Sequence, residues 1–171
     1  MRGGSWQKSD DGIVHITLPG ADRETNGNKW IETMDELGIS RGSYVGSMLN
    51  SVDFNMVEVG EHELVAVPVE FFTSSNGSAH NIRLEAMRHG WDCPYAQDAC
   101  LFAEAFSRRE FKEMGLKWLV VMHKPITPDV DIRKLLLFRI DSVHSDLELN
   151  PYSGADSAIF SPEGTLLFAV T

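Results

Sequence analysis

The stretch KWLVVMHKPI, residues 117–126, limits the fold of this chain more than any other segment. Its apolar residues follow one another without the alternation expected of a strand that has one face in water. The stretch therefore predicts a strand that is apolar on both faces and central in its sheet. A long strand is expected next, over residues 131–143, and then a hairpin over residues 157–170 that turns at Pro162–Gly164.

Similar patterns divide the rest of the chain into strands and helices. Strand-like segments occur at residues 11–18, 52–59 and 64–72. Apolar residues at helical spacing predict helices at residues 28–37, 79–89, 94–106 and 107–115. Asn28 is the expected N-cap of the first helix, and Ser107 begins a Ser-x-x-Glu capping box. Runs of strands alternate with runs of helices, which favours an α+β domain with a largely antiparallel mixed sheet. The central two or three helices are expected to pack on one face of this sheet.

A chain of 171 residues is expected to form one domain, residues 1–171, with a substantial buried core. The first ten residues, MRGGSWQKSD, are expected to be a flexible extension. They contain no apolar signal segment, and no apolar run approaches the roughly 20 residues of a membrane-spanning helix. These features predict a soluble, cytoplasmic protein with no membrane partner.

The net charge of −10 is unevenly distributed along the chain. Residues 107–140 contain eight Lys or Arg and four Asp or Glu, whereas residues 141–171 contain five acidic residues and no basic one. An acidic molecule is repelled by a phosphate backbone, so a nucleic-acid partner is not expected. The basic segment is the region expected to attract an anion, although it also fits a solvated helix face beside a strand edge.

Both cysteines lie in the stretch RHGWDCPYAQDAC. Gly90 and Pro94 predict a corner where one helix ends and the next begins. On a common helix, Cys93 and Cys100 would lie roughly 10 Å apart, too far for a disulfide, which favours two free thiols. Cys100 falls among alanines and is expected in the core. Cys93, near a predicted helix N-terminus, is the candidate nucleophile if the protein is an enzyme, with His123 as the base.

Motifs for metal ions and nucleotides are missing from the sequence. The nearest metal-like set, His89, Cys93 and Cys100, lacks the close ligand pairs of zinc sites and crosses the predicted helix break. Neither of the glycine-rich nucleotide motifs occurs. The sequence therefore predicts no metal site and no cofactor, and no carboxylate pair indicates acid–base catalysis.

Another interpretation concerns residues 30–49. A helix, the glycine turn at Gly38 and a second amphipathic segment resemble a helix-turn-helix, which would make the protein a DNA-binding regulator. Gly42 and Gly46 weaken the second helix by about 1 kcal/mol each relative to alanine. Arg41 is the one basic residue near the turn, where phosphate contacts need several. These two features weaken the interpretation, so DNA binding is kept only as an alternative.

Five residues are the candidates for ligand binding. His123 and Lys124 come at the end of the predicted central strand, before a proline-bounded loop, where sheet proteins often place site residues. Lys124 and Arg133 could supply positive charge for an anionic ligand. Trp91 and Tyr95 belong to the aromatic-rich helical segment and could line a pocket between helices and sheet.

These observations together favour a non-catalytic binding or interaction module. Its ligand would be either a small molecule held between helices and sheet or a basic protein partner that meets the acidic surface. A homo-oligomer is compatible with the sequence. A cysteine-dependent enzyme that uses Cys93 and His123 is the first alternative, and a DNA-binding regulator is the second.

Overall fold

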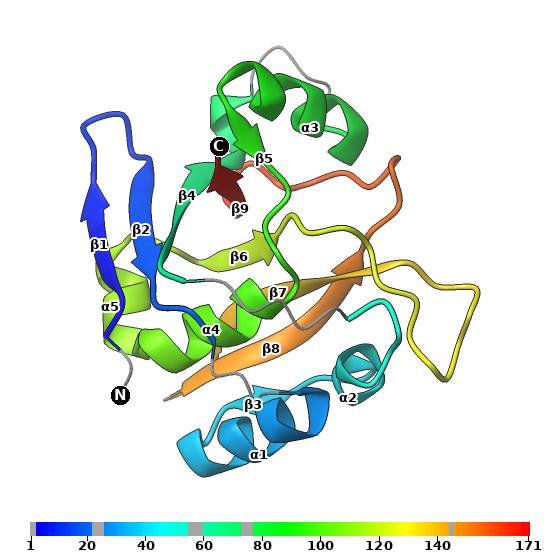
Figure 1. The fold of residues 1–171 in the computed structure, drawn as a ribbon. Coiled ribbons are helices and arrows are strands. Elements are labelled where there is room, and N and C mark those ends of the chain that lie inside the picture. The colour runs from blue at the N-terminus through cyan, green and yellow to red at the C-terminus, as the bar shows by residue number, and fades with distance from the viewer. Residues whose placement is uncertain (1–2, 22–25, 55–59, 73–76, 144–145) are drawn as a thin grey trace.

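The computed structural model describes residues 3–21, 26–54, 60–72, 77–143 and 146–171 of the chain. These residues form one compact domain with five α-helices and a nine-stranded mixed sheet, which confirms the predicted α+β class (Figure 1). The helices are α1 (Gly27–Leu37), α2 (Val45–Leu49), α3 (Ala79–Arg88), α4 (Gln97–Ala105) and α5 (Arg108–Glu113), with a short 3-10 helix at Val69–Phe71. The strands are β1 (Ser5–Lys8), β2 (Val14–Leu18), β3 (Ser40–Arg41), β4 (His62–Pro68), β5 (Trp91–Asp92), β6 (Trp118–Val121), β7 (Leu136–Val143), β8 (Asp146–Ser153) and β9 (Thr165–Val170).

The described strands follow the order β1-β2-β4-β9-β6-β7-β8-β3, and β5 pairs with the end of β9. Neighbouring strands are antiparallel except for β6 with β9 and β3 with β8. β6 lies between β7 and β9, with Val120 opposite both Arg139 and Leu166. Leu119, Val120 and Val121 are all buried. The central strand predicted from the apolar stretch is therefore confirmed.

The sheet separates two apolar cores. One core contains residues of α1, α2, α4 and α5, with Phe102 and Phe111 fully buried in it. The other contains Ile82 of α3, together with Val120 and Phe168 of the sheet. Figure 1 shows α3 on one side of the sheet and α1, α2 and α4 on the other. The helical middle is thus divided between both faces, unlike the expected packing on one face, because the chain passes through β5 between α3 and α4.

The beginning of the chain differs from the expected flexible extension. Ser5–Lys8 form β1 and pair with β2, with Trp6 opposite Ile16. Trp6 also packs against the core that contains α4. Three of the four residues of β1 are exposed, so this edge strand has too little apolar alternation to be predicted from its sequence.

The hairpin predicted over residues 157–170 is not formed. Thr165–Val170 form β9, whose neighbours β4 and β6 come from earlier parts of the chain. Ile159 instead makes an isolated antiparallel bridge with Ser78, just before α3. The predicted turn is present, since the Gly164 N–H donates to the carbonyl of Ser161, but it does not join two paired strands.

Several strand boundaries also differ from the expected ones, and β7 begins at Leu136 instead of Asp131. Residues 146–153, which the sequence patterns leave unassigned, form β8 and pair with β7 along its whole length. Residues 52–54 form a turn in place of the start of a strand, and residues 55–59 lie outside the described residues. The strand expected at residues 64–72 is β4, and it ends at Pro68.

Helix boundaries follow the capping side chains. α1 begins after Asn26, whose Oδ1 accepts the Lys29 N–H at 3.0 Å, so the N-cap is not Asn28. α1 ends at Gly38, which has the positive φ of 71° that favours glycine. The predicted capping box of Ser107 is confirmed at the start of α5.

Two predicted helical arrangements are replaced by short strands. The expected helix corner at residues 90–94 contains β5, and α4 begins only at Gln97. In the helix-turn-helix-like stretch, β3 separates α1 from α2, and α2 has only five residues.

None of the helices within the described residues is long and apolar enough to cross a membrane.

Candidate ligand-binding site

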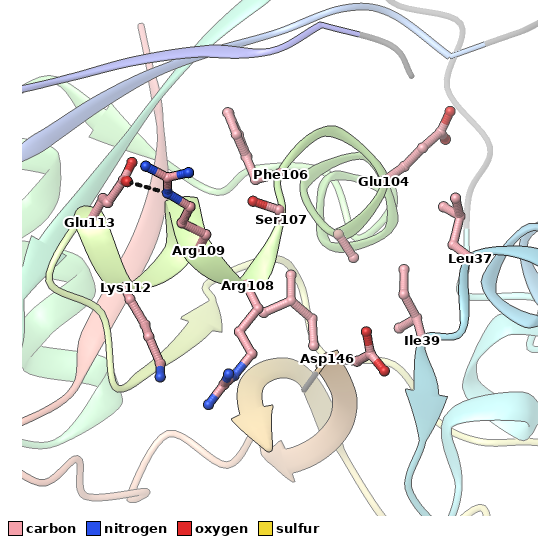
Figure 2. A pocket seen from close by; sticks show the side chains of 12 residues that line it. Leu37, Ile39, Glu104, Phe106, Ser107, Arg108, Arg109, Lys112, Glu113 and Asp146 are labelled. Carbon is pink, nitrogen blue, oxygen red and sulfur yellow. Dashed lines mark hydrogen bonds and ion pairs between the residues drawn. The ribbon is translucent and has the colours of Figure 1, made fainter. Parts of the chain in front are cut away.

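A cavity of about 640 Å³ lies where α4 and α5 approach β8 and the turn after α1 (Figure 2). We call it the α4–α5 pocket. Apolar side chains form its floor: Leu37, Ile39, Ala103, Phe106 and Leu147. Charged side chains surround them: Glu104, Arg108, Arg109, Lys112, Glu113 and Asp146. The size falls within the range of small-molecule sites, and the pocket lies between helices and sheet.

The capping box at the start of α5 positions the basic side chains of this pocket. The Ser107 hydroxyl accepts the Glu110 N–H, and the Glu110 carboxylate accepts the Ser107 N–H. Arg108 and Lys112 are four residues apart, and therefore share one side of α5. Arg109 points elsewhere and pairs with Glu113 at 2.9 Å.

Arg108 and Lys112 are the cations of this pocket with donors to spare. The Arg108 Nε donates to the Ser142 hydroxyl of β7 at 3.0 Å, which orients the guanidinium. Among the described residues, neither Arg108 nor Lys112 forms an ion pair with a carboxylate. Figure 2 shows both side chains on the α5 side of the pocket, with Glu104 on the side of Leu37.

The floor of the pocket is part of the larger apolar core. Ile39, Phe106 and Leu147 are buried, and they come from the turn after α1, the end of α4 and β8. The rings of Phe102 and Phe106 lie 4.9 Å apart, which holds Phe106 in place. The arrangement offers a firm apolar surface next to two available cations, which suits a molecule with an apolar body and an anionic head.

None of the residues that line this pocket was predicted individually from the sequence. Arg108 and Lys112 belong to the basic segment 107–140, and the capping box at Ser107 indicated that they lie on one helix. The sequence therefore indicated that Arg108 and Lys112 lie together on one basic helix. The apolar floor had no such signal, because Ile39 and Leu147 meet only in the folded chain.

His123, the leading candidate from the sequence, is a buried residue with both ring nitrogens engaged. Its side chain is 1% exposed, Nδ1 lies 2.7 Å from the Lys124 carbonyl, and Nε2 accepts the Phe138 N–H at 3.0 Å. These contacts define the neutral form with the proton on Nδ1. Burial lowers the pKa of His123 to about 4, and the nearby Arg83 charge acts in the same direction. This geometry leaves no ring nitrogen for a ligand.

Lys124 and Arg133 are both exposed. The Arg133 Nε donates to the Asp131 carboxylate at 3.1 Å. Arg133 also lines a second cavity, of about 500 Å³, which we call the Tyr44–Tyr152 pocket after two of its residues. The positive charge predicted for Arg133 is therefore available at a cavity, but this cavity is not formed by His123.

The two aromatic candidates have separate surroundings. Trp91 of β5 stacks on His89, with ring centroids 4.8 Å apart, and packs against the core beneath α3. It lines a groove that also includes residues of β1 and β2. Tyr95 is exposed and lies 6.4 Å from the His62 ring, measured between centroids.

Cys93 is not at a helix N-terminus, because α4 begins four residues later. Arg83 of α3 donates to the Cys93 sulfur at 3.2 Å and to the carbonyl oxygens of Met122 and His123 at 2.7 and 3.0 Å. The Cys93–His123 pair of the enzyme hypothesis is therefore not supported by the geometry, since both nitrogens of the imidazole have other partners. Cys100 is buried, and burial raises the pKa of its thiol well above the ordinary value, with the Asp98 charge adding to the effect.

One buried polar pair was not anticipated from the sequence. Asp98 is 1% exposed, and its Oδ1 lies 3.1 Å from Nε2 of His62, while its Oδ2 accepts the Tyr95 N–H at 3.0 Å. The pair joins the first turn of α4 to the start of β4.

Within the described residues, no group of three or more His, Cys, Asp or Glu side chains could hold a metal ion. Comparison with protein-family models, curated proteins and solved structures gives no match for this chain.

Proposed function

We propose that the protein is a non-catalytic binding module that holds a small amphipathic anion in the α4–α5 pocket. One observation carries the proposal: Arg108 and Lys112 lie beside a buried apolar floor, and among the described residues neither is neutralised by a carboxylate. An anionic head would bind these two side chains. An apolar body would cover Ile39, Phe106 and Leu147.

The expected affinity is modest. A charge-assisted hydrogen bond contributes about 1.5–3 kcal/mol, and apolar contact contributes roughly 25 cal/mol for each Å² removed from water. Part of this free energy is lost with the translational and rotational freedom of the ligand. Dissociation constants between about 1 μM and 1 mM are therefore expected.

The proposal is tested by calorimetric titration with hexanoate, octanoate and decanoate. Each added methylene is worth up to about 0.8 kcal/mol when buried, so two of them should strengthen binding by roughly tenfold. Octanol, which has the same chain as octanoate but no charge, should bind at least about tenfold more weakly. An affinity that depends on neither chain length nor charge would contradict the proposal.

Single substitutions locate the binding site. Lys112→Gln and Arg108→Gln should each weaken octanoate binding by roughly tenfold, because each removes one charged partner of the head group. Lys117→Gln is the matched control, since Lys117 is exposed, belongs to the same basic segment and does not line the pocket. Equal losses in all three variants would mean that the carboxylate responds to the general charge of the basic segment and not to this pocket.

The other hypotheses from the sequence stay predictions. A basic protein partner would contact the acidic regions outside residues 107–140. A DNA-binding regulator would have to use α2, which is too short for the usual recognition helix. An enzyme based on Cys93 would need a base other than His123.

A further inference from the structure

The most exposed aliphatic side chains of the described residues gather at one corner of the molecule. Val52 is 91% exposed, Ile132 is 83% exposed and Val130 is 74% exposed, and Leu135 is also exposed nearby in the chain. Three of these four residues belong to the loop between β6 and β7, which projects beside α2 (Figure 1, yellow). We call this surface, residues 127–135 with Val52, the β6–β7 corner. Clustered exposed aliphatic residues are typical of interaction sites, whereas isolated ones are not informative.

Hydrogen bonds hold the corner against the rest of the protein. The Thr127 N–H donates to the Asp53 carboxylate at 2.9 Å, and the Ser51 hydroxyl donates to the Thr127 carbonyl. The Val130 N–H donates to the Ser47 hydroxyl of α2 at 3.1 Å. These hydrogen bonds join residues 47–53 to residues 127–130, which are distant in the sequence. A surface held in this way loses little conformational entropy when a partner binds.

The Tyr44–Tyr152 pocket adjoins this corner, and the charged residues that line it, Arg133 and Lys134, are both basic. Arg133, Lys134 and Leu135 line both surfaces, and no described lining residue of the pocket is acidic, although the chain has a net charge of −10. The Lys134 ammonium lies 5.2 Å from the centroid of the Tyr44 ring, a cation–π contact. Arg133 uses its Nε for Asp131, and its terminal nitrogens are the donors that remain for a carboxylate.

Tyr44 is held in a strained backbone conformation at this pocket. Its φ is 72°, and it is the one described residue other than glycine with a positive φ. This conformation costs about 1–3 kcal/mol for a non-glycine residue and persists only where the surroundings impose it. In this conformation the Tyr44 ring lies next to Lys134. Tyr and Arg are also the residues most often found at the energetic centres of protein interfaces.

We infer that the β6–β7 corner docks an acidic, apolar segment of another protein. An acidic side chain of the partner binds Arg133 and Lys134 in the Tyr44–Tyr152 pocket, and neighbouring apolar side chains cover Val130 and Ile132. The charge of the pocket selects an acidic partner. Asp129 and Asp131 flank the exposed aliphatic residues, so the acidic side chain of the partner lies at the pocket and only apolar side chains cover Val130 and Ile132. The inference is independent of the α4–α5 pocket, which has different lining residues.

The probe is a phage-displayed library of random peptides selected on the wild-type protein. We expect the selected peptides to share an acidic residue close to aliphatic or aromatic ones. A labelled synthetic peptide of the selected sequence is then titrated by fluorescence anisotropy. Ile132→Ser and Lys134→Glu should each weaken its binding at least about tenfold, which corresponds to an interface anchor. Met87→Ser is the matched control, because Met87 is an exposed apolar residue of α3.

Several outcomes would overturn the inference. It fails if no acidic motif is selected, or if Ile132→Ser and Lys134→Glu bind the peptide as tightly as the wild type. It fails if Lys112→Gln weakens peptide binding equally, because the peptide would then occupy the α4–α5 pocket. A wild-type dimer that Ile132→Ser converts to a monomer would assign the corner to a second copy of the chain. Binding to phosphatidylglycerol vesicles that depends on Ile132 would assign it to a membrane. Circular dichroism of each variant checks that the fold is kept.

Discussion

At the scale of single residues, His123 is kept neutral by burial and by two backbone contacts. Its pKa is about 4 in the folded chain, below the ordinary value of 6.5. The unfolded chain therefore binds more protons than the folded chain between these two values. The contribution of His123 to stability is fully present above pH 6.5 and is lost as the pH falls towards 4.

Lowering the pH from 7 to 5 should therefore cost about 2 kcal/mol of unfolding free energy through His123 alone. His123→Gln should be less stable than the wild type at pH 7. Between pH 7 and pH 5, however, its unfolding free energy should fall by about 2 kcal/mol less than that of the wild type. The measurement is urea denaturation at both pH values. Leu84→Ala, which changes an exposed residue without a titratable group, is the control and should keep the wild-type dependence. An unchanged pH dependence in His123→Gln would mean that this histidine is not the group that titrates.

The two cysteines should differ strongly in reactivity. Cys100 is fully buried and its thiol has a raised pKa, whereas Cys93 is partly exposed. Only the thiolate is nucleophilic, so iodoacetamide should modify Cys93 in the native protein and modify Cys100 only after unfolding. Mass spectrometry of the digested protein resolves the two sites. Comparable native rates at both cysteines would contradict the buried position of Cys100.

At the scale of elements, α5 is a six-residue helix that depends on its capping box. Its first turn has N–H groups without partners in the helix, and the side chains of Ser107 and Glu110 compensate for this. The same helix presents Arg108 and Lys112 to the α4–α5 pocket. Ser107 therefore links the stability of α5 to the shape of the α4–α5 pocket.

Ser107→Ala should lower the unfolding free energy by about 1 kcal/mol, because the N-cap hydroxyl is lost. The same variant should weaken octanoate binding if the pocket of the proposed function is correct. Urea denaturation and calorimetry measure the two effects. Ser157→Ala, in an exposed turn, is the control and should change neither. A stable Ser107→Ala variant would show that packing alone holds α5.

At the scale of the whole molecule, β6 is the element shared by both cores. Leu119 belongs to the core that contains α4, and Val120 belongs to the core beneath α3. Successive residues of a strand point to opposite faces, so one strand stabilises both layers of helices. The fold is a sheet covered on both sides, with this strand between β7 and β9.

Leu119→Ala and Val120→Ala should both be strongly destabilising, by about 3 and about 2 kcal/mol, because each leaves a cavity in a different core. Leu84→Ala on the exposed side of α3 should stay within about 0.5 kcal/mol of the wild type. Urea denaturation provides the comparison. If only one of the two core variants is destabilised, only one face of the sheet is tightly packed.

Predictions from the sequence succeeded for features that depend on neighbouring residues. The apolar stretch of β6, the glycine that ends α1 and the capping box of α5 are each specified by residues that are close in the chain. The runs of strand-like and helical patterns also predicted the α+β class, which the structure confirms. The positive charge of residues 107–140 was visible as well, and it supplies Arg108, Lys112, Arg133 and Lys134 to the two pockets.

The sequence by itself thus determined several single elements, such as β6, α3 and α5, together with the α+β class and the location of the basic residues. The tertiary structure alone decided that β5 inserts beside β9, that α3 and α4 lie on opposite faces, and that His123 is sealed by the Phe138 N–H. It also decided that Ile39 and Leu147 together form the floor of the α4–α5 pocket. The physical reason is that hydrogen bonds and apolar contacts between distant segments depend on strand pairing, which a short-range pattern of residues does not encode.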